Sequence, residues 1–112
     1  MIEDDFLRRY EDWKHYVRED ASCQMASSDA AFIENPSFRA IVALGPAAIP
    51  AIVGHLFRDD CSHFLHHALR ELTGHKFSPE DLAAALQLFG QLGNQAECAM
   101  WLGWWTKNRH KF

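Results

Sequence analysis

The sequence lacks several patterns that would assign a chemistry to it. Its 112 residues contain no run of Lys and Arg, and acidic residues outnumber these basic ones by 15 to 11, for a formal net charge of −4. Proteins that track nucleic-acid phosphates carry a basic stripe or patch, so we expect no nucleic-acid partner. The six glycines are dispersed along the chain and form no loop that would cradle a phosphate group.

Cysteines and long apolar runs are also scarce. Cys23, Cys61 and Cys98 are far apart and form no C-x-x-C pair, so we interpret them as free thiols in a reducing compartment. No stretch approaches the roughly 18 apolar residues of a membrane-spanning helix. The acidic start, Met1 to Asp5, lacks the apolar segment of a secretory signal. We therefore expect a cytoplasmic protein that binds no membrane.

Apolar and aromatic residues are abundant. They include eight Phe, four Trp and two Tyr, and 48% of the chain is hydrophobic. A chain of this length folds as one domain and hides about two thirds of its unfolded surface. We expect a single domain over residues 1–112.

Apolar residues recur every three to four positions along most of the chain, a pattern typical of helices. The first predicted helix docks through a narrow apolar stripe made of Ile2, Phe6, Tyr10, Trp13 and Val17. Helices are predicted over residues 2–19, 29–34, 37–44, 50–58, 63–73, 79–92 and 95–107. No segment alternates as a strand does. The predicted fold is all-α, with a docking helix over 1–19 and a helical core over 28–107.

Capping residues set the predicted ends of these helices. Side-chain oxygens that can cap a helix start belong to Ser28, Ser62, Ser78 and Asn94. Prolines that fit a first turn are Pro50 and Pro79. Glycines that can end a helix are Gly45, Gly74 and Gly93.

The later helices each have a predicted core face. Helix 50–58 buries Ile49, Ile52, Val53, Leu56 and Phe57. Helix 79–92 buries Leu82, Ala85, Leu86 and Phe89. Helix 95–107 buries Cys98, Trp101, Leu102 and Trp105.

Three short stretches carry a family resemblance. In Ile41-Val42-Ala43-Leu44-Gly45-Pro46-Ala47-Ala48-Ile49-Pro50 one helix ends in Leu-Gly and the next begins with small residues and a proline, as in a HEAT-type unit. Together with Ala68–Gly74 and Ala99–Trp104, this stretch is similar to a group of small, poorly characterised bacterial proteins with a HEAT-like helical fold. The resemblance implies a compact HEAT- or armadillo-like stack of helices with surfaces for partners.

Three histidines form one candidate site. His63, His66 and His67 are three and four residues apart on helix 63–73, so their side chains share a face. Because the apolar residues of this helix lie opposite, we expect a solvated face. The open alternatives are a weak Zn²⁺ or Ni²⁺ site and a pH-responsive surface. No second ligand pair occurs at metal spacing, so no metal or other cofactor is predicted.

Met100 and Trp104 form the other candidate. They lie four residues apart on the flank of the last helix, beside its buried stripe. Either a neighbouring helix such as the first covers both, or they form an exposed patch that binds a partner, because Met and aromatic side chains concentrate binding energy. We take them as the candidate partner-binding residues.

These observations predict a non-enzymatic module that binds another protein. Its size and mild acidity suggest an immunity- or inhibitor-type protein, and a homodimer is a further alternative. A metal- or pH-responsive role for the histidine face is the second hypothesis. An enzyme that pairs Cys61 with a histidine is the third, but no orienting acid or oxyanion hole is identifiable, so no catalytic residue is predicted.

Overall fold

The computed structural model describes residues 2–20, 30–59, 62–90 and 96–111. Within those ranges every regular element is helical, which confirms the all-α prediction. The α-helices are α1 (Ile2–Glu19), α3 (Ala30–Ile33), α4 (Pro36–Val42), α5 (Ile49–Gly54), α6 (Leu65–Thr73), α7 (Pro79–Phe89) and α8 (Ala96–Asn108). Short 3-10 helices cover Pro46–Ala48, Ser62–Phe64 and Arg109–Lys111.

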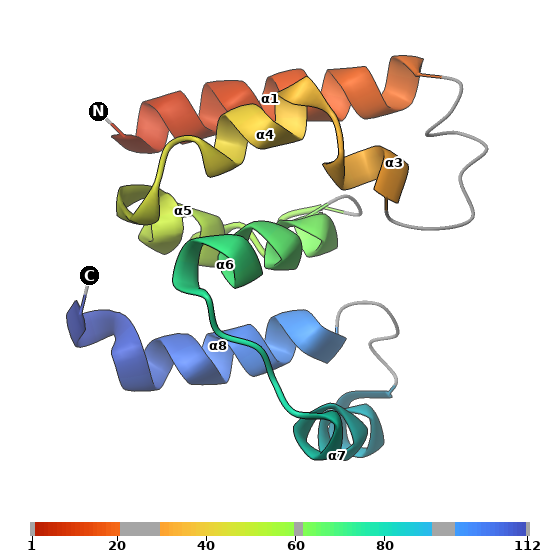
Figure 1. Cartoon of the computed structure of the whole chain (residues 1–112), viewed down its shortest axis with the longest axis vertical. Helices are drawn as coiled ribbons and strands as arrows, with labels where there is room; N and C mark the ends of the chain where they lie inside the picture. The colour runs from red at the N-terminus through yellow and green to blue at the C-terminus, as the bar shows by residue number, and fades with distance from the viewer. Residues whose placement is uncertain (1, 21–29, 60–61, 91–95, 112) are drawn as a thin grey trace.

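The helices are arranged in successive layers (Figure 1). α1 and α4 lie side by side in one layer, α5 and α6 lie beneath them, and α8 lies beneath α6. α7 is at the far end of the stack, where its main contact is with α8. α7 is therefore the outermost helix of the stack, and among the described helices it packs mainly against one neighbour, α8.

The core forms where the apolar stripe of α1 meets the inner helices. Phe6, Tyr10, Trp13 and Val17 are buried as predicted, whereas Ile2 at the helix start is 37% exposed. Three acidic residues occupy the first turn of α1, where the helix dipole favours negative charge. The predicted docking of this helix through one face is thus confirmed for four of its five stripe residues.

Local signals placed several helix ends correctly. The Ser78 hydroxyl accepts a hydrogen bond from the Asp81 backbone N–H at 3.1 Å, Pro50 lies in the first turn of α5, and Gly74 ends α6 with a left-handed φ of 71°. Three predicted caps or stops, Ser28, Gly93 and Asn94, lie outside the described residues.

Asn35 has a role that the sequence analysis missed. Its side-chain oxygen accepts a hydrogen bond from the Phe38 N–H at 2.9 Å, which caps α4. Its amide nitrogen donates to the carbonyl oxygens of Phe32, at 2.9 Å, and Ala31, at 3.1 Å, which end α3. One buried side chain therefore supplies partners to two helix ends, whose backbone groups have none within their own helices.

Ser62 does not cap a helix, so that prediction was wrong. Its hydroxyl is buried, lies 2.7 Å from the Tyr10 hydroxyl and accepts a hydrogen bond from the Asp59 N–H at 3.0 Å. The Tyr10 hydroxyl also donates to Asp59 Oδ1 at 2.8 Å, and Lys14 Nζ lies 3.1 Å from Asp59 Oδ2. This polar cluster joins α1 to the turn before α6, and that tertiary contact takes the hydroxyl that the cap would have used.

We expect Tyr10→Phe to lower the free energy of unfolding by about 1–3 kcal/mol, because the buried Ser62 hydroxyl and the part-buried Asp59 carboxylate lose a partner while the ring stays in place. Urea denaturation of the two proteins measures this difference. A change within experimental error would show that the cluster contributes nothing to stability.

Three predicted core residues are exposed instead. Phe57 is 40% exposed because α5 already ends at Gly54, so the helical face does not continue to it. Leu102 is 39% and Leu86 59% exposed. The side chain of Phe89 lies outside the described part of the structure.

The exposure of Leu102 has a rotational cause. Trp101 and Cys98 are fully buried, and the half-buried residues Glu97 and Trp104 flank them on the side away from Leu102. At about 100° per residue, this centres the buried face of α8 on Trp101. The predicted stripe of Cys98, Trp101, Leu102 and Trp105 is centred between Trp105 and Cys98, so it was rotated toward Leu102 and away from the observed face.

Across the described residues no single helix combines the length and apolarity that a membrane crossing needs; only Pro36–Val42 and Pro46–Gly54 taken together, bent by 86°, meet that test.

Candidate functional site: an apolar face on α7 and α8

α7 exposes large apolar side chains at the end of the stack. Leu86 is 59% exposed and Leu88 is 73% exposed, while Ala85 is buried in the face that approaches α8. The helix contains no Lys or Arg. An apolar helix with one packed side is normally covered by another element, because exposed apolar patches of this kind mark interaction sites.

A groove lies along one side of α7, and we call it the Trp104 groove. Its volume is about 420 Å³, and its apolar walls include Phe77, Ala84, Leu88, Met100 and Trp104. Two opposite charges, Asp81 from α7 and Lys107 from α8, also line it. Such a mixture of apolar wall and charged rim suits a polypeptide side chain or helix.

A second groove, the Leu86 groove, lies on the other side of α7. Its volume is about 350 Å³, and Leu82, Leu86, Ala96 and Met100 provide its apolar lining. Met100 lines both grooves. The two leucines that are two residues apart thus face different grooves, so α7 presents apolar surface on both of its flanks.

Met100 and Trp104 are neither fully covered by a neighbouring helix nor fully exposed, the two alternatives that the sequence left open. Both are half-buried. The Trp104 ring packs 5.3 Å from the Trp101 ring and 5.9 Å from His75, so the cover comes from the segment before α7 and not from α1. Because α8 is rotated toward Trp104, one side of this ring joins the core and the other lines a groove.

Leu88 is the residue of this face that sequence reasoning did not single out, and Leu86 was assigned to the core. A signal was present, since α7 is apolar on nearly every side: its sequence is PEDLAAALQLF. A helix with that pattern is either surrounded within its own chain or covered by a partner. The sequence analysis assigned a single buried face to α7 and so did not consider that a partner covers the rest of it.

The histidine face of α6 is buried, which overturns the expectation of a solvated surface. His63, in the 3-10 helix before α6, is 9% exposed, and His66 in α6 is 7% exposed, because α8 packs against both. His67 is half-buried. The expectation of a solvated face was wrong because the buried surface of α6 includes His66 as well as apolar residues.

His66 makes two short contacts, and the one with Glu97 joins α6 to α8. Its Nε2 lies 2.7 Å from Glu97 Oε2, and its Nδ1 lies 2.6 Å from the carbonyl oxygen of His63. Each ring nitrogen of His66 therefore faces an oxygen that can only accept a hydrogen bond. Arg70 donates to Glu97 Oε1 at 3.0 Å. Hydrogen bonds from His66 and Arg70 lower the pKa of Glu97 to about 2, against the opposing effect of burial.

These contacts leave the histidines poorly arranged for metal binding. The His63 ring lies tilted beside the Phe64 ring, with ring centres 4.2 Å apart, and both ring nitrogens of His66 face the acceptors described above. In the described ranges no group of three or more His, Cys, Asp or Glu side chains is placed to hold a metal ion. Cys61, which precedes this face, lies outside those ranges.

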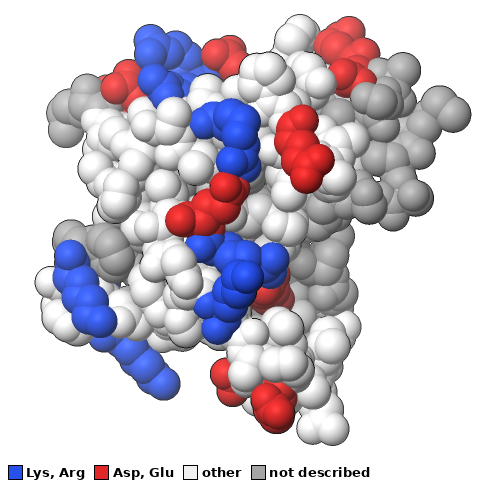
Figure 2. All heavy atoms as spheres, in the orientation of Figure 1, with Lys and Arg blue, Asp and Glu red and all other residues white. Residues whose placement is uncertain are grey.

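Charged side chains on the α4–α6 side pair with each other. Figure 2 shows red and blue groups next to one another across this face. Arg39 makes a two-point contact with Glu71, with distances of 2.8 Å and 2.5 Å, and this pair links α4 to α6. The guanidinium lowers the pKa of Glu71 below its usual value. The pairing offsets the charges of these two side chains.

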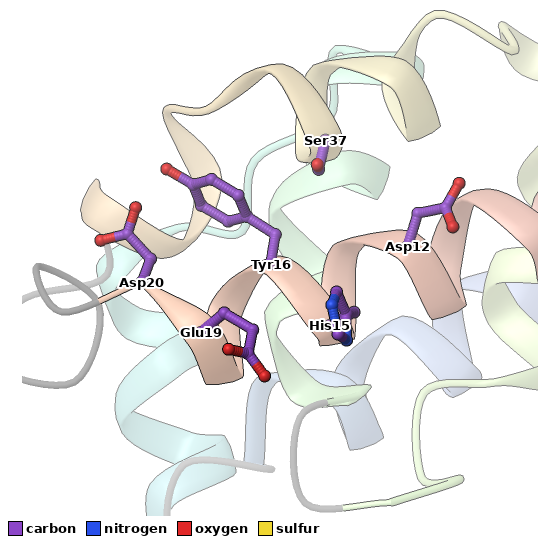
Figure 3. Close-up of a pocket in the computed structure, with 6 residues that line it drawn as sticks. All are labelled: Asp12, His15, Tyr16, Glu19, Asp20 and Ser37. Carbon is purple, nitrogen blue, oxygen red and sulfur yellow. The ribbon is translucent and has the colours of Figure 1, made fainter.

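A third hollow, of about 480 Å³, lies between α1 and the start of α4 (Figure 3). It is lined by Asp12, His15, Tyr16, Glu19, Asp20 and Ser37. The carboxylates of Asp12, Glu19 and Asp20 point in different directions, so they do not converge on a point where a cation would be held. The α7–α8 face therefore offers the better binding surface.

Comparisons of the chain with protein-family models, with curated proteins and with solved structures found no match.

Proposed function

We propose that this chain is a non-enzymatic, cytoplasmic protein-binding module, and that it binds its partner through the α7–α8 face formed by Leu86, Leu88, Met100 and Trp104. The observation that carries the proposal is the exposure of the two leucines, 59% and 73%, beside two grooves. Covering a large aliphatic side chain contributes about 1.5–3 kcal/mol. A partner on this face would gain that contribution from both sides of α7.

The position of the face in the stack supports the same proposal. Stacked helical modules bury each layer against the next, and their terminal layers have polar outer faces when nothing covers them. α7 is the terminal layer here, and its flanks are apolar. In HEAT-like proteins, which the sequence resembles, helical faces of this kind serve partners.

The ionisable groups with large pKa shifts support a structural role over catalysis. Burial raises the pKa of the Cys98 thiol to about 12, so this cysteine is a poor nucleophile at neutral pH. Glu97, whose pKa is lowered to about 2, is occupied by His66 and Arg70. The narrower immunity- or inhibitor-type role has the support of size and charge alone, so the proposal is made for protein binding in general.

The metal-binding and pH-responsive alternatives for the histidines have less support. Both ring nitrogens of His66 face acceptors, on Glu97 and on the His63 backbone, so this side chain serves to hold α6 in place against its neighbours.

We expect Leu88→Asp to weaken partner binding at least about tenfold while the melting temperature stays close to that of the wild type, because an exposed side chain contributes to the interface and little to the core. Pull-down from a native lysate with quantitative mass spectrometry measures the retention of the partner. Phe57→Asp is the matched control, since Phe57 is 40% exposed and lines neither groove. Equal retention by both variants and the wild type would contradict the proposed face.

A further inference from the structure

We infer that the partner on the α7–α8 face is a second copy of this chain, which makes the protein a two-fold symmetric dimer built around α7. The inference rests on the proposed function of that face and names its occupant. It follows from the shape of the exposed α7 flank and of the Trp104 groove, and from the charged side chains that lie beside them.

The first argument is complementarity between a helix and a groove. The exposed helix flank carries Leu88, and the Trp104 groove is lined by apolar side chains from α7, α8 and the segment before α7. α7 forms one wall of this groove, so it cannot also fill the groove in its own molecule. The exposed Leu88 flank of α7 from a second copy can enter it, and a two-fold axis then lets each chain insert one such flank and receive one.

The second argument is charge. The first turn of α7 exposes Glu80 and Asp81, and this helix has no basic residue. The end of α8 and the turn after it expose Lys107, Arg109 and Lys111. None of these five side chains forms an ion pair with another described residue.

The acidic and basic groups flank the same apolar region. Asp81 and Lys107 both line the Trp104 groove, and Figure 2 shows acidic groups over α7 and basic groups near the end of α8 in the lower part of this view. A helix that suits the groove has apolar flanks and an acidic start, and α7 itself has both. In the dimer the acidic turn of each copy faces the basic end of the other, which favours this partner and this orientation.

Sedimentation equilibrium of the purified protein over a concentration series tests the inference. We expect the wild type and Phe57→Asp to give the mass of two chains, and Leu88→Asp to give the mass of one chain under the same conditions. A wild type that stays monomeric over the series would overturn the inference, as would a Leu88→Asp protein that still dimerises. Circular dichroism melting confirms that each variant is folded.

Two charge reversals test the orientation of the pair. Asp81→Lys alone and Lys107→Glu alone each place like charges opposite one another in both halves of the dimer, so each weakens dimerisation at least about tenfold. When the two variants are mixed, every such contact joins opposite charges, and dimers of one chain of each type form. If the single variants fail to dimerise because of repulsion between residues 81 and 107 of one chain, that repulsion remains in the mixture and no mixed dimer forms. A mixture that stays monomeric would therefore contradict the arrangement.

The outcomes separate this inference from the proposed function. If the purified wild type is monomeric and Leu88→Asp still loses a stoichiometric partner from the lysate, the face binds a different protein and the inference fails alone. If Leu88→Asp changes neither dimerisation nor retention of any partner, the proposed function fails with it.

Discussion

Trp101→Ala is expected to lower the free energy of unfolding by about 3–5 kcal/mol, the usual cost of truncating a fully buried Trp. Trp101 is 0% exposed and its ring packs against Phe77 and Trp104, at 5.0 Å and 5.3 Å between ring centres. Folded domains have a stability of only about 5–15 kcal/mol. This variant is therefore expected to be partly or wholly unfolded near body temperature.

Leu102→Ala is the matched control on the same helix. Leu102 is 39% exposed, so its truncation is expected to cost less than about 1 kcal/mol. Trp101→Phe is a second control: the indole N–H of Trp101 has no acceptor among the described residues, so replacing the ring with a smaller one removes contacts without breaking a hydrogen bond. Chemical denaturation of the variants measures all three effects. Equal losses for Trp101→Ala and Leu102→Ala would mean that α8 is not rotated as described.

The second large effect is the dependence of stability on acid. The pKa of Glu97 falls from an ordinary 4.5 to about 2 in the folded chain, a difference that corresponds to about 3 kcal/mol of stabilisation. Because the folded-state pKa is lower than the unfolded one, this stabilisation is fully present above about pH 4.5. It is lost as the pH falls toward 2.

We expect Glu97→Gln to be less stable than the wild type at neutral pH and to lose less stability between pH 5 and pH 2, because the amide cannot accept from His66 and Arg70 as a carboxylate does. Unfolding in urea at a series of pH values gives both quantities. Glu3→Gln, in the exposed first turn of α1, is the control and should follow the wild type. Parallel pH curves for Glu97→Gln and the wild type would show that Glu97 is not the linked group.

Local structure was largely predictable from the sequence, because its causes lie within a few residues. The stripe of α1 follows from helical period alone, and the start of α7 follows from the adjacent Ser78 and Pro79. Gly74 ends α6 because glycine adopts a left-handed φ without steric cost. In each case no other part of the chain overrides the local preference.

The errors arise where contacts with residues far away in the sequence decide the role of a side chain. Ser62 bonds to Tyr10 across 52 positions of the chain, and that contact replaces the predicted cap. His66 is buried because α8 brings Glu97 to it from another part of the sequence. Hydrophobic pattern alone ranks a histidine as polar and therefore outward, and it contains no information about a carboxylate that will pair with it.

The candidate site was half predictable for the same reason. Met100 and Trp104 were found because they fall outside the stripe that the sequence predicted for α8, and both line the Trp104 groove. Leu88 was missed because an apolar helix was assumed to be buried within its own chain. The number of neighbours that surround α7 is a property of the whole stack, and residues 79–92 do not encode it by themselves.

The most direct test of the proposed face is photocrosslinking from its most exposed leucine. A benzophenone side chain replaces Leu88 in one protein and Phe57 in a control, and each is irradiated in native lysate. We predict a discrete crosslinked species of defined mass from position 88 and none of that mass from position 57, with the second polypeptide identified by mass spectrometry. No crosslink from position 88, or the same species from both positions, would contradict binding through the α7–α8 face.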